Sequence, residues 1–180
     1  MTTSSEKIRA WKGAAILGFG FRPFFLSAAI LAAVAMVIWI PLVTGAISIP
    51  VAYGPLEWHA HEFLWGYVSA AVAGFLLTAV PNWTGRLPIA GYPLGGLWLL
   101  WISGRAAMLI GGALPAGIPA IVDASFLPVF AAVVAREIIA GANWRNLKVL
   151  MVLSLLAASN ILFHAEALKD AAAASGYGLR

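Results

Sequence analysis

Three histidines, His59, His61 and His164, are the residues of this chain with the clearest potential for chemistry. An imidazole nitrogen is a good ligand for haem iron and for copper. Cysteine is absent, which excludes disulfides, thiolate zinc sites, iron–sulfur clusters and covalent c-type haem attachment. A metal bound to this chain would therefore be held by histidine, carboxylate, methionine or backbone oxygen.

The short separation of His59 and His61 restricts how they can act together. Positions i and i+2 of an α-helix differ by about 200°, so two helical histidines at this spacing cannot face one pocket. In an extended segment they would share a face. We expect His61 to be the helical ligand and His59 to lie on an extended segment that leads into the helix. Asn160 precedes His164 by one helical turn and is expected to orient its imidazole.

Charged residues inside apolar stretches are the second group with functional potential, because a charge in a membrane is costly and is usually paired inward. Arg105 and Asp123 fall in neighbouring stretches. Two interpretations are open: an ion pair that holds two helices together, or an Arg105 that binds an anionic group such as a haem propionate. Glu62 and Glu166 flank the histidines, where they would orient imidazoles, bind copper or lie in headgroup water. Headgroup water is the expectation for Glu166.

The elements that would position these residues are membrane-spanning helices. Hydrophobic residues make up 62% of the 180 residues and charged residues only 10%, whereas a soluble domain has about half apolar and about a quarter charged residues. A bilayer is crossed by about 20 apolar residues of helix. The sequence predicts one all-α transmembrane helical domain over residues 1–180, with about five spans: Phe24–Val43, His61–Val80, Pro93–Gly112, Ile118–Ile139 and Leu147–Leu168.

The distribution of basic residues predicts the orientation of these helices, because lysine and arginine stay on the cytoplasmic side. None occurs in Thr44–Ala60 or Gly111–Gly117. They occur instead before the first span and around the loops that follow the second and fourth: Lys7, Arg9, Lys12, Arg22, Arg86, Arg136, Arg145 and Lys148. Lys169 and Arg180 go mildly against this pattern. The N-terminus is expected in the cytoplasm, and the three histidines at the outer, periplasmic face.

Two further patterns concern helix packing. Gly66, Ala70 and Gly74 form a stripe of small residues along the second span, which is typical of close helix contacts in membranes. Pro128 lies within the fourth span and is expected to kink it.

Several stretches, in their order and spacing, resemble the NnrS family. They are GFGFRPFF (18–25), EWHAHEFLWGY (57–67), AGFLLTAVPNWTGR (73–86), NWRNL (143–147) and NILFH (160–164). The joint occurrence of W-H-A-H-E and T-A-V-P-N-W-T-G-R is the specific part of the resemblance, which extends from about Gly18 to His164. The family usually has more spans than are predicted here. The resemblance therefore implies an N-terminal portion, a truncated member or a shorter relative.

The resemblance implies a multi-pass protein of the bacterial inner membrane that carries haem b and copper. It implies a role in nitric oxide metabolism or in resistance to nitrosative stress during denitrification. His59, His61 and His164 match family histidines that are candidate metal ligands, and we expect His61 and His164 to be the best candidates for haem, with Arg105 near a propionate. The resemblance does not assign one metal to each histidine. Nitric oxide is the expected small ligand, and it is apolar enough to reach a site from the lipid.

Two other functions stay open from the sequence. A transporter or channel segment would use Arg105, Asp123 and Glu62 as a polar path, although the inner halves of the spans carry few polar residues. If the chain is instead an assembly or structural subunit, the histidines have no metal-binding role. No clear acid–base pair or nucleophile stands out, so binding, sensing, protection and turnover are all open. Expected partners are the lipid bilayer and partner helices or an oligomer; the few, dispersed basic residues do not favour nucleic acid.

Overall fold

The computed structural model describes residues 13–115 and 117–177, and the regular elements within these ranges are all helical. In chain order they are η1 (Ala15–Gly18), α2 (Phe21–Val43), α3 (Pro55–His61), η2 (Glu62–Tyr67), α4 (Val68–Thr84), α5 (Tyr92–Leu109), η3 (Gly111–Ala113), α6 (Ile118–Ala124), α7 (Phe126–Ala140), η4 (Trp144–Asn146) and α8 (Leu147–Tyr177). The predicted all-α fold is confirmed. Lys7, Arg9, Lys12 and Arg180, which entered the orientation argument, lie outside the described residues.

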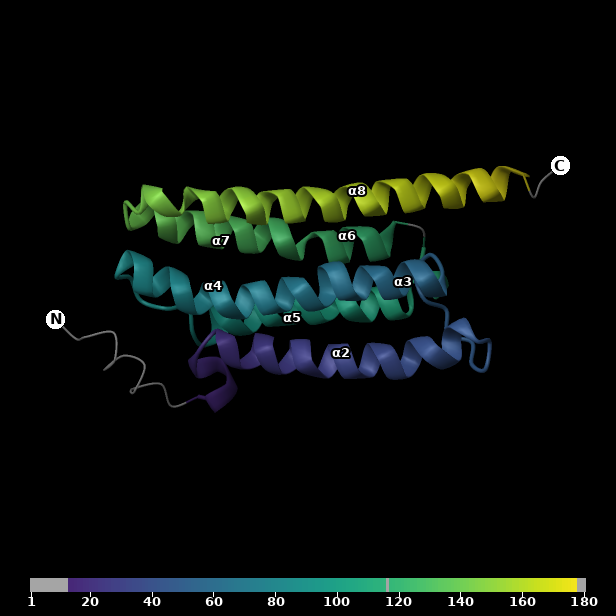
Figure 1. Cartoon of the computed structure of the whole chain (residues 1–180), viewed down its shortest axis with the longest axis horizontal. Helices are drawn as coiled ribbons and strands as arrows, with labels where there is room; N and C mark the ends of the chain where they lie inside the picture. Colours follow the sequence, from purple (N-terminus) through teal and green to yellow (C-terminus); the bar gives the residue numbers. More distant parts are fainter. Residues whose placement is uncertain (1–12, 116, 178–180) are drawn as a thin grey trace.

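The helices form elongated rods that lie side by side (Figure 1). α3, η2 and α4 follow one another without a break and make one rod, and α6 and α7 make another that is interrupted at Ser125. In Figure 1, α2 runs along the lower edge, α4 and α5 lie in the middle, and α6, α7 and α8 lie above them. Contacts join α2 to α4, α5 to α6, and α7 to α8. The middle rods are thereby covered on both sides.

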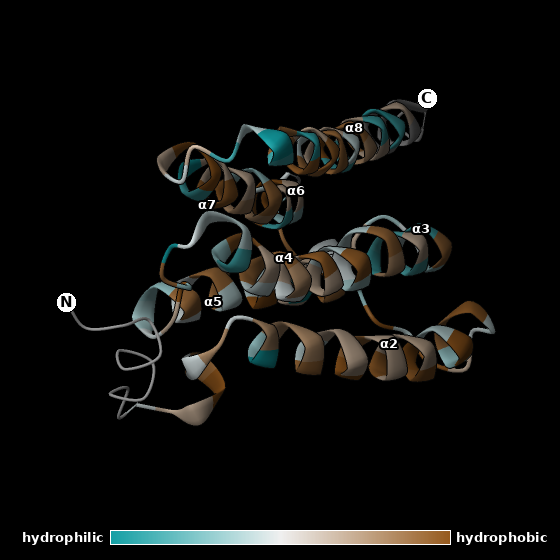
Figure 2. Cartoon of the chain, turned by 60° about the vertical axis from the view of Figure 1, so that its left-hand side comes forward, coloured by the Kyte–Doolittle hydropathy of each residue, from teal (hydrophilic) through white to brown (hydrophobic). Residues whose placement is uncertain are grey.

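Within the described residues, four segments are long and apolar enough to cross a membrane: Phe21–Val43, Pro55–Thr84, Ile118–Ala140 and Trp144–Asp170. They contain most of the predicted spans. The predicted span Pro93–Gly112 forms α5, which is shorter than these segments and is not among them. The number of crossings and the cytoplasmic N-terminus therefore stay predictions. Large apolar side chains are exposed on α2 and α8, as lipid contact requires, and Figure 2 shows brown, hydrophobic residues along both helices.

The break at Ser125 places the end of α6 directly after Asp123. Pro128 has no N–H to donate to the carbonyl of Ala124, four residues earlier, and its ring disfavours a regular turn there. The Ser125 hydroxyl donates to the carbonyl of Val122 at 2.7 Å. The kink predicted from Pro128 is confirmed, and it lies next to the carboxylate of the candidate site.

Small residues allow the second rod to approach its neighbours, as the glycine and alanine stripe predicts. A Cβ atom on Gly74 would lie only 2.7 Å from the ring of Phe25 on α2, and Ala70 is completely buried. A Cβ atom on Gly66 would collide with the guanidinium group of Arg105. The stripe is therefore a packing surface, and at Gly66 it also makes room for a charged side chain.

Indole N–H groups link the rods that carry the site. Trp65 donates to the hydroxyl of Ser159 at 3.0 Å and joins the second rod to α8. Trp98 of α5 donates to the hydroxyl of Ser27 on α2 at 2.8 Å. A buried indole usually finds such a partner, and each bond fixes the register of one helix against another.

Candidate functional site

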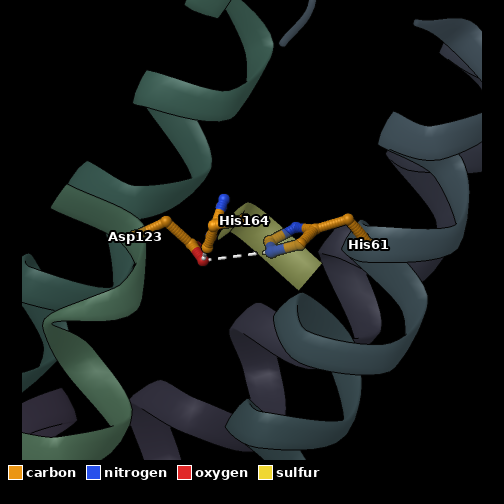
Figure 3. Close-up of side chains that lie close together, drawn as sticks. All are labelled: His61, Asp123 and His164. Atoms are coloured by element: carbon orange, nitrogen blue, oxygen red, sulfur yellow. Dashed lines mark hydrogen bonds and ion pairs between the residues drawn. The ribbon is translucent and has the colours of Figure 1, made fainter. Parts of the chain in front are cut away.

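Two of the three histidines meet around one carboxylate in the interior of the bundle. His61 ends α3, Asp123 lies at the end of α6, and His164 lies on α8; all three residues are at most 3% exposed. The Nε2 atoms of His61 and His164 lie 3.0 Å and 2.9 Å from the same oxygen, Oδ2 of Asp123 (Figure 3). The two ring centroids are 5.0 Å apart. One ligand atom from each residue lies within 4.8 Å of the others, which is a spacing that suits a single metal ion.

A π-helical turn, η2, begins directly after His61 and covers Glu62–Tyr67. Such a turn inserts one residue into an otherwise α-helical rod, and π turns are frequent at functional sites. The carbonyl oxygen of Gly66, inside this turn, accepts a bond from the indole of Trp101 on α5 at 3.1 Å. The turn is thus supported from α5, and it brings Glu62 into the interior beside His61.

Arg105 of α5 links two buried carboxylates that come from different rods. Its Nη1 atom lies 3.1 Å from Oε2 of Glu62, and its Nη2 atom contacts Oδ1 of Asp123. Of the two interpretations that the sequence left open for Arg105, the ion pair with Asp123 is present in the structure, and Glu62 is a second partner of the guanidinium group. Two carboxylates face one guanidinium, so with neutral imidazoles the cluster carries one negative charge in excess. Such a group in a membrane interior favours binding of a cation.

Tyr53, in the loop between α2 and α3, contacts His164 across the bundle. Its hydroxyl lies 2.7 Å from Nδ1 of His164. Burial raises the pKa of Tyr53 to about 12, so the phenol stays protonated at neutral pH and donates this bond. We therefore assign the hydrogen of His164 to Nε2, where it is donated to Asp123. Tyr53 has a φ of 70°, an uncommon conformation for a bulky residue, and its contact with His164 helps to hold it there.

The hydrogen bonds of His61 leave one of its nitrogens without a partner. Its Nε2 atom lies 3.0 Å from Oδ1 of Asn160 and from Oδ2 of Asp123, two acceptors, so we assign the hydrogen to Nε2. The other nitrogen, Nδ1, is buried and makes no hydrogen bond; its neighbour Oε1 of Glu62, 3.7 Å away, makes none either. Two buried acceptors that face each other without a donor are costly. A proton on Nδ1 would replace the repulsion between these two atoms by an attraction.

Asn160 orients a histidine, but not the one expected from its helical spacing. It accepts from His61 through Oδ1, and its Nδ2 atom donates to Oδ2 of Asp123 at 3.0 Å. The prediction that it would orient His164 is wrong, because the face that these two residues share on α8 points at side chains of two other rods. Glu166 is exposed and pairs with Lys169 at 2.9 Å, in agreement with the prediction for it.

His59 does not join the cluster. Gly54 and Pro55 start α3 before it, since proline suits the first helical position, so His59 is helical and not extended as predicted. Its ring points towards α2, where it stacks on Trp39 with centroids 4.0 Å apart and an interplanar angle of 15°. The prediction of an extended lead-in segment is wrong, and the angular separation of helical positions i and i+2 explains why His59 and His61 face opposite sides.

A shallow apolar groove of about 240 Å³ on the flank of the bundle reaches Arg105. Residues of α2 and α5 line it: Ser27, Ile30, Leu31, Val34, Trp101, Ile102 and Arg105. The guanidinium group of the same Arg105 contacts the carboxylates of the cluster. A small apolar molecule in the bilayer thus has a concave surface that ends at the charged network.

Sequence reasoning missed Tyr53 as a contact of the cluster and underrated Glu62. Tyr53 precedes the second predicted span, and no helical periodicity could connect it with His164, which lies 111 positions away. Glu62 was expected beside the histidines, but its burial and its ion pair with Arg105 depend on the π turn, for which the sequence has no simple pattern.

Apolar rods that enclose imidazole, carboxylate and guanidinium groups define a helical membrane protein with a buried polar site. The chain belongs to the NnrS family, since the family model described as "NnrS protein" matches residues 15–180. The resemblance carried by the motifs is thereby confirmed over nearly the whole chain. No curated protein and no solved structure matches the chain significantly.

Proposed function

We propose that this chain is a metal-binding protein of the bacterial inner membrane that acts in the response to nitric oxide, with copper held by His61, Asp123 and His164. Membership of the NnrS family supports the physiological role. The cluster of three buried side chains supports the metal. Nitrogen and carboxylate ligands of this kind suit copper among the first-row metals.

The observation that carries the proposal is the unsatisfied pair formed by Nδ1 of His61 and Oε1 of Glu62. A metal ligated by the Nε2 atom of an imidazole leaves the ring hydrogen on Nδ1. On His61 this hydrogen would face Glu62, and on His164 it would face the hydroxyl oxygen of Tyr53, which also accepts hydrogen bonds. Metal-bound histidines usually donate their other N–H to a carboxylate or a similar acceptor. The surroundings of both rings therefore suit the metal-bound tautomers.

Charge supports a cation as well. Glu62 and Asp123 outnumber Arg105, so a bound cation compensates the excess negative charge. Arg105 holds both carboxylates in place. Copper in such a site would supply redox and ligand-binding chemistry, while the chain's own residues orient the imidazoles and exclude water.

Haem b, the second cofactor that the family suggests, fits less well between His61 and His164. A porphyrin needs a flat slot between its two axial ligands. The carboxylate of Asp123 fills the space between these two rings, and Asn160 contacts the same edge of His61. Binding of haem by this pair would displace both side chains. We therefore propose the compact copper ion for the cluster, and haem ligation by His61 and His164 stays a prediction to be tested by spectroscopy.

Nitric oxide is the proposed small ligand of this site. The groove between α2 and α5 opens on the flank of the bundle and is lined mostly by apolar side chains, which suits a small apolar molecule that arrives through the lipid. Arg105 at its end lies against the cluster. The same arrangement serves binding, sensing or turnover.

Proton or ion transport is the second candidate function. Hydrogen bonds and ion pairs run from Tyr53 through His164 and Asp123 to His61 without interruption. Chains of this type carry protons in membrane proteins. Towards the other end of the bundle, however, the core consists of large apolar side chains such as Phe130, Val134 and Ile138, which support a closed end rather than a continuous path.

Metal titration of the purified protein tests the proposal. Copper should bind with one ion per chain and raise the melting temperature, because a ligand at 100 times its Kd adds about 2.7 kcal/mol of stability. His61→Ala and His164→Ala should each lower copper affinity by more than the 10- to about 100-fold that loss of a supporting partner costs. His59→Ala removes an imidazole from the opposite face of α3 and should leave copper binding unchanged. Equal affinities for all three variants would exclude the cluster as the copper site.

A further inference from the structure

A second charged cluster lies at the end of the bundle opposite the imidazoles, where α4 and α7 end (left side of Figure 1). The Nε atom of Arg86 donates to Oε2 of Glu137 at 2.6 Å, and the Nε atom of Arg136 donates to Oε1 at 2.9 Å. Two guanidinium groups thus share one carboxylate and leave one positive charge in excess. The Glu137 side chain is only 10% exposed, whereas those of Arg86 and Arg136 are 43% and 67% exposed. The cluster can therefore donate hydrogen bonds to an anion from outside.

An open groove of about 610 Å³ surrounds this cluster and is lined by Arg86, Arg136, Glu137 and the loop at residues 85–90. A second groove, of about 360 Å³, shares Arg86 with it and continues between the start of α2 and the end of α4. The second groove is lined in part by Phe21 and Leu77, so its walls are more apolar. The groove with the two arginines therefore adjoins the second groove, which we call the apolar seam.

The position of these grooves in the bundle matches the boundary of a membrane. Trp83 and Trp144 are exposed at the same end of the rods, and tryptophan is enriched where hydrocarbon meets headgroups. Basic pockets between membrane helices bind the headgroups of anionic lipids. Arginine suits a phosphate, because its planar group donates two parallel hydrogen bonds.

We propose that the two grooves form a binding site for one anionic phospholipid. The phosphate group lies against Arg86 and Arg136, where the excess positive charge selects an anionic headgroup over a zwitterionic one. An acyl chain lies in the seam between α2 and α4, against Phe21, Leu77 and the exposed side of Thr78. The site is independent of the metal cluster. A bound lipid would contact the loop between α4 and α5, which lines the larger groove.

Native mass spectrometry of the full chain in detergent tests the site with dioleoyl phosphatidylglycerol and dioleoyl phosphatidylcholine as probes. We expect the anionic lipid to be retained preferentially. Arg136→Gln should lower its retention about fivefold, the factor that one basic residue near a membrane surface contributes. Arg136 is the suitable position because Arg86 still pairs with Glu137 in the variant. Arg145→Gln removes the same charge at the same end outside the grooves, and it should leave retention unchanged.

Two further arms separate a lipid site from a site for free phosphate and test the apolar seam. Thr78 is exposed and lines the seam, so Thr78→Trp fills it without burying a new side chain in the core and should lower retention of the lipid. Millimolar glycerol 3-phosphate should not displace the lipid. Equal retention of both lipids, equal effects of Arg136→Gln and Arg145→Gln, an unchanged Thr78→Trp variant, or displacement by glycerol 3-phosphate would each overturn the proposal.

Discussion

The phenol of Tyr53 and the imidazole of His164 lie 2.7 Å apart although 111 positions separate them in the chain. This contact connects a loop outside the candidate spans with a buried imidazole of α8. It assigns the ring hydrogen of His164 to Nε2 in the metal-free protein, and it would provide an acceptor for Nδ1–H if a metal were bound at Nε2.

Tyrosine titration tests the environment of this phenol. Because burial raises the pKa of Tyr53 from 10.0 to about 12, the fold favours the neutral phenol. The contribution of this group to stability is complete below pH 10, and it is lost as the pH rises towards 12. The ultraviolet absorbance of the intact protein should show a tyrosine component near pH 12 that is missing in Tyr53→Phe. An identical titration curve for both proteins would contradict the buried hydrogen bond.

The same variant tests the role of Tyr53 as a support of the metal site. Tyr53→Phe keeps the ring but removes the oxygen that would accept from Nδ1 of His164. Copper affinity should fall about 10-fold, at the lower end of the range for supporting partners of metal-bound histidines. Tyr67→Phe is the matched control, because Tyr67 lies on the second rod outside the cluster. The two affinities are compared by competition with a copper chelator.

Removal of Arg105 should destabilise the metal-free protein strongly. Arg105→Gln leaves Glu62 and Asp123 buried without their cation, and breaking a buried ion pair costs about 3–5 kcal/mol. Saturating copper should restore part of this loss, because a bound cation also compensates the carboxylates. Unfolding in mixed detergent measures both effects, with the exposed Arg145→Gln as control. A variant as stable as the unmodified chain would show that the ion pairs of Arg105 are dispensable.

Gly66 should not tolerate even a methyl group. A Cβ atom there would collide with Arg105 and would lie 2.9 Å from Oε2 of Glu62. Gly66→Ala should therefore lower the free energy of unfolding by about 1–3 kcal/mol, the usual cost of overpacking. At Gly96 of α5, a Cβ atom would meet no other atom within 4 Å, and Gly96→Ala should be neutral or stabilising. Thermal melting measures both variants. An unchanged melting temperature for Gly66→Ala would show that the π turn can move to accommodate a methyl group.

The apolar groove should control access of nitric oxide to the cluster. Val34 lines this groove and is 46% exposed, so Val34→Trp should cover it without disturbing the core. Association of nitric oxide, followed by stopped-flow absorbance, should become slower while copper affinity stays the same. Val37→Trp, on the same helix but outside the groove, should leave the rate unchanged. Equal rates for both variants would mean that the ligand reaches the cluster by another route.

The sequence predicted the helical class, the stretches that form the rods and the kink near Pro128, and it offered the pairing of Arg105 with Asp123 as one of two interpretations. These follow from apolar runs, proline chemistry and the cost of a charge in lipid, which are local or nearly local properties. It did not predict the start of α3 before His59, and this one boundary decides that His59 faces α2. It also could not predict the contacts of Tyr53 and Glu62, which depend on how four rods pack and on a π turn.

α5 is synthesised after Glu62 and before Asp123, the two residues that neutralise its arginine. α5 carries Arg105 among apolar residues, and a charge inside a membrane is usually paired with another charged group. The two partners of Arg105 therefore come from one segment that precedes α5 and one that follows it, so the complete charge network can form only once α6 is present.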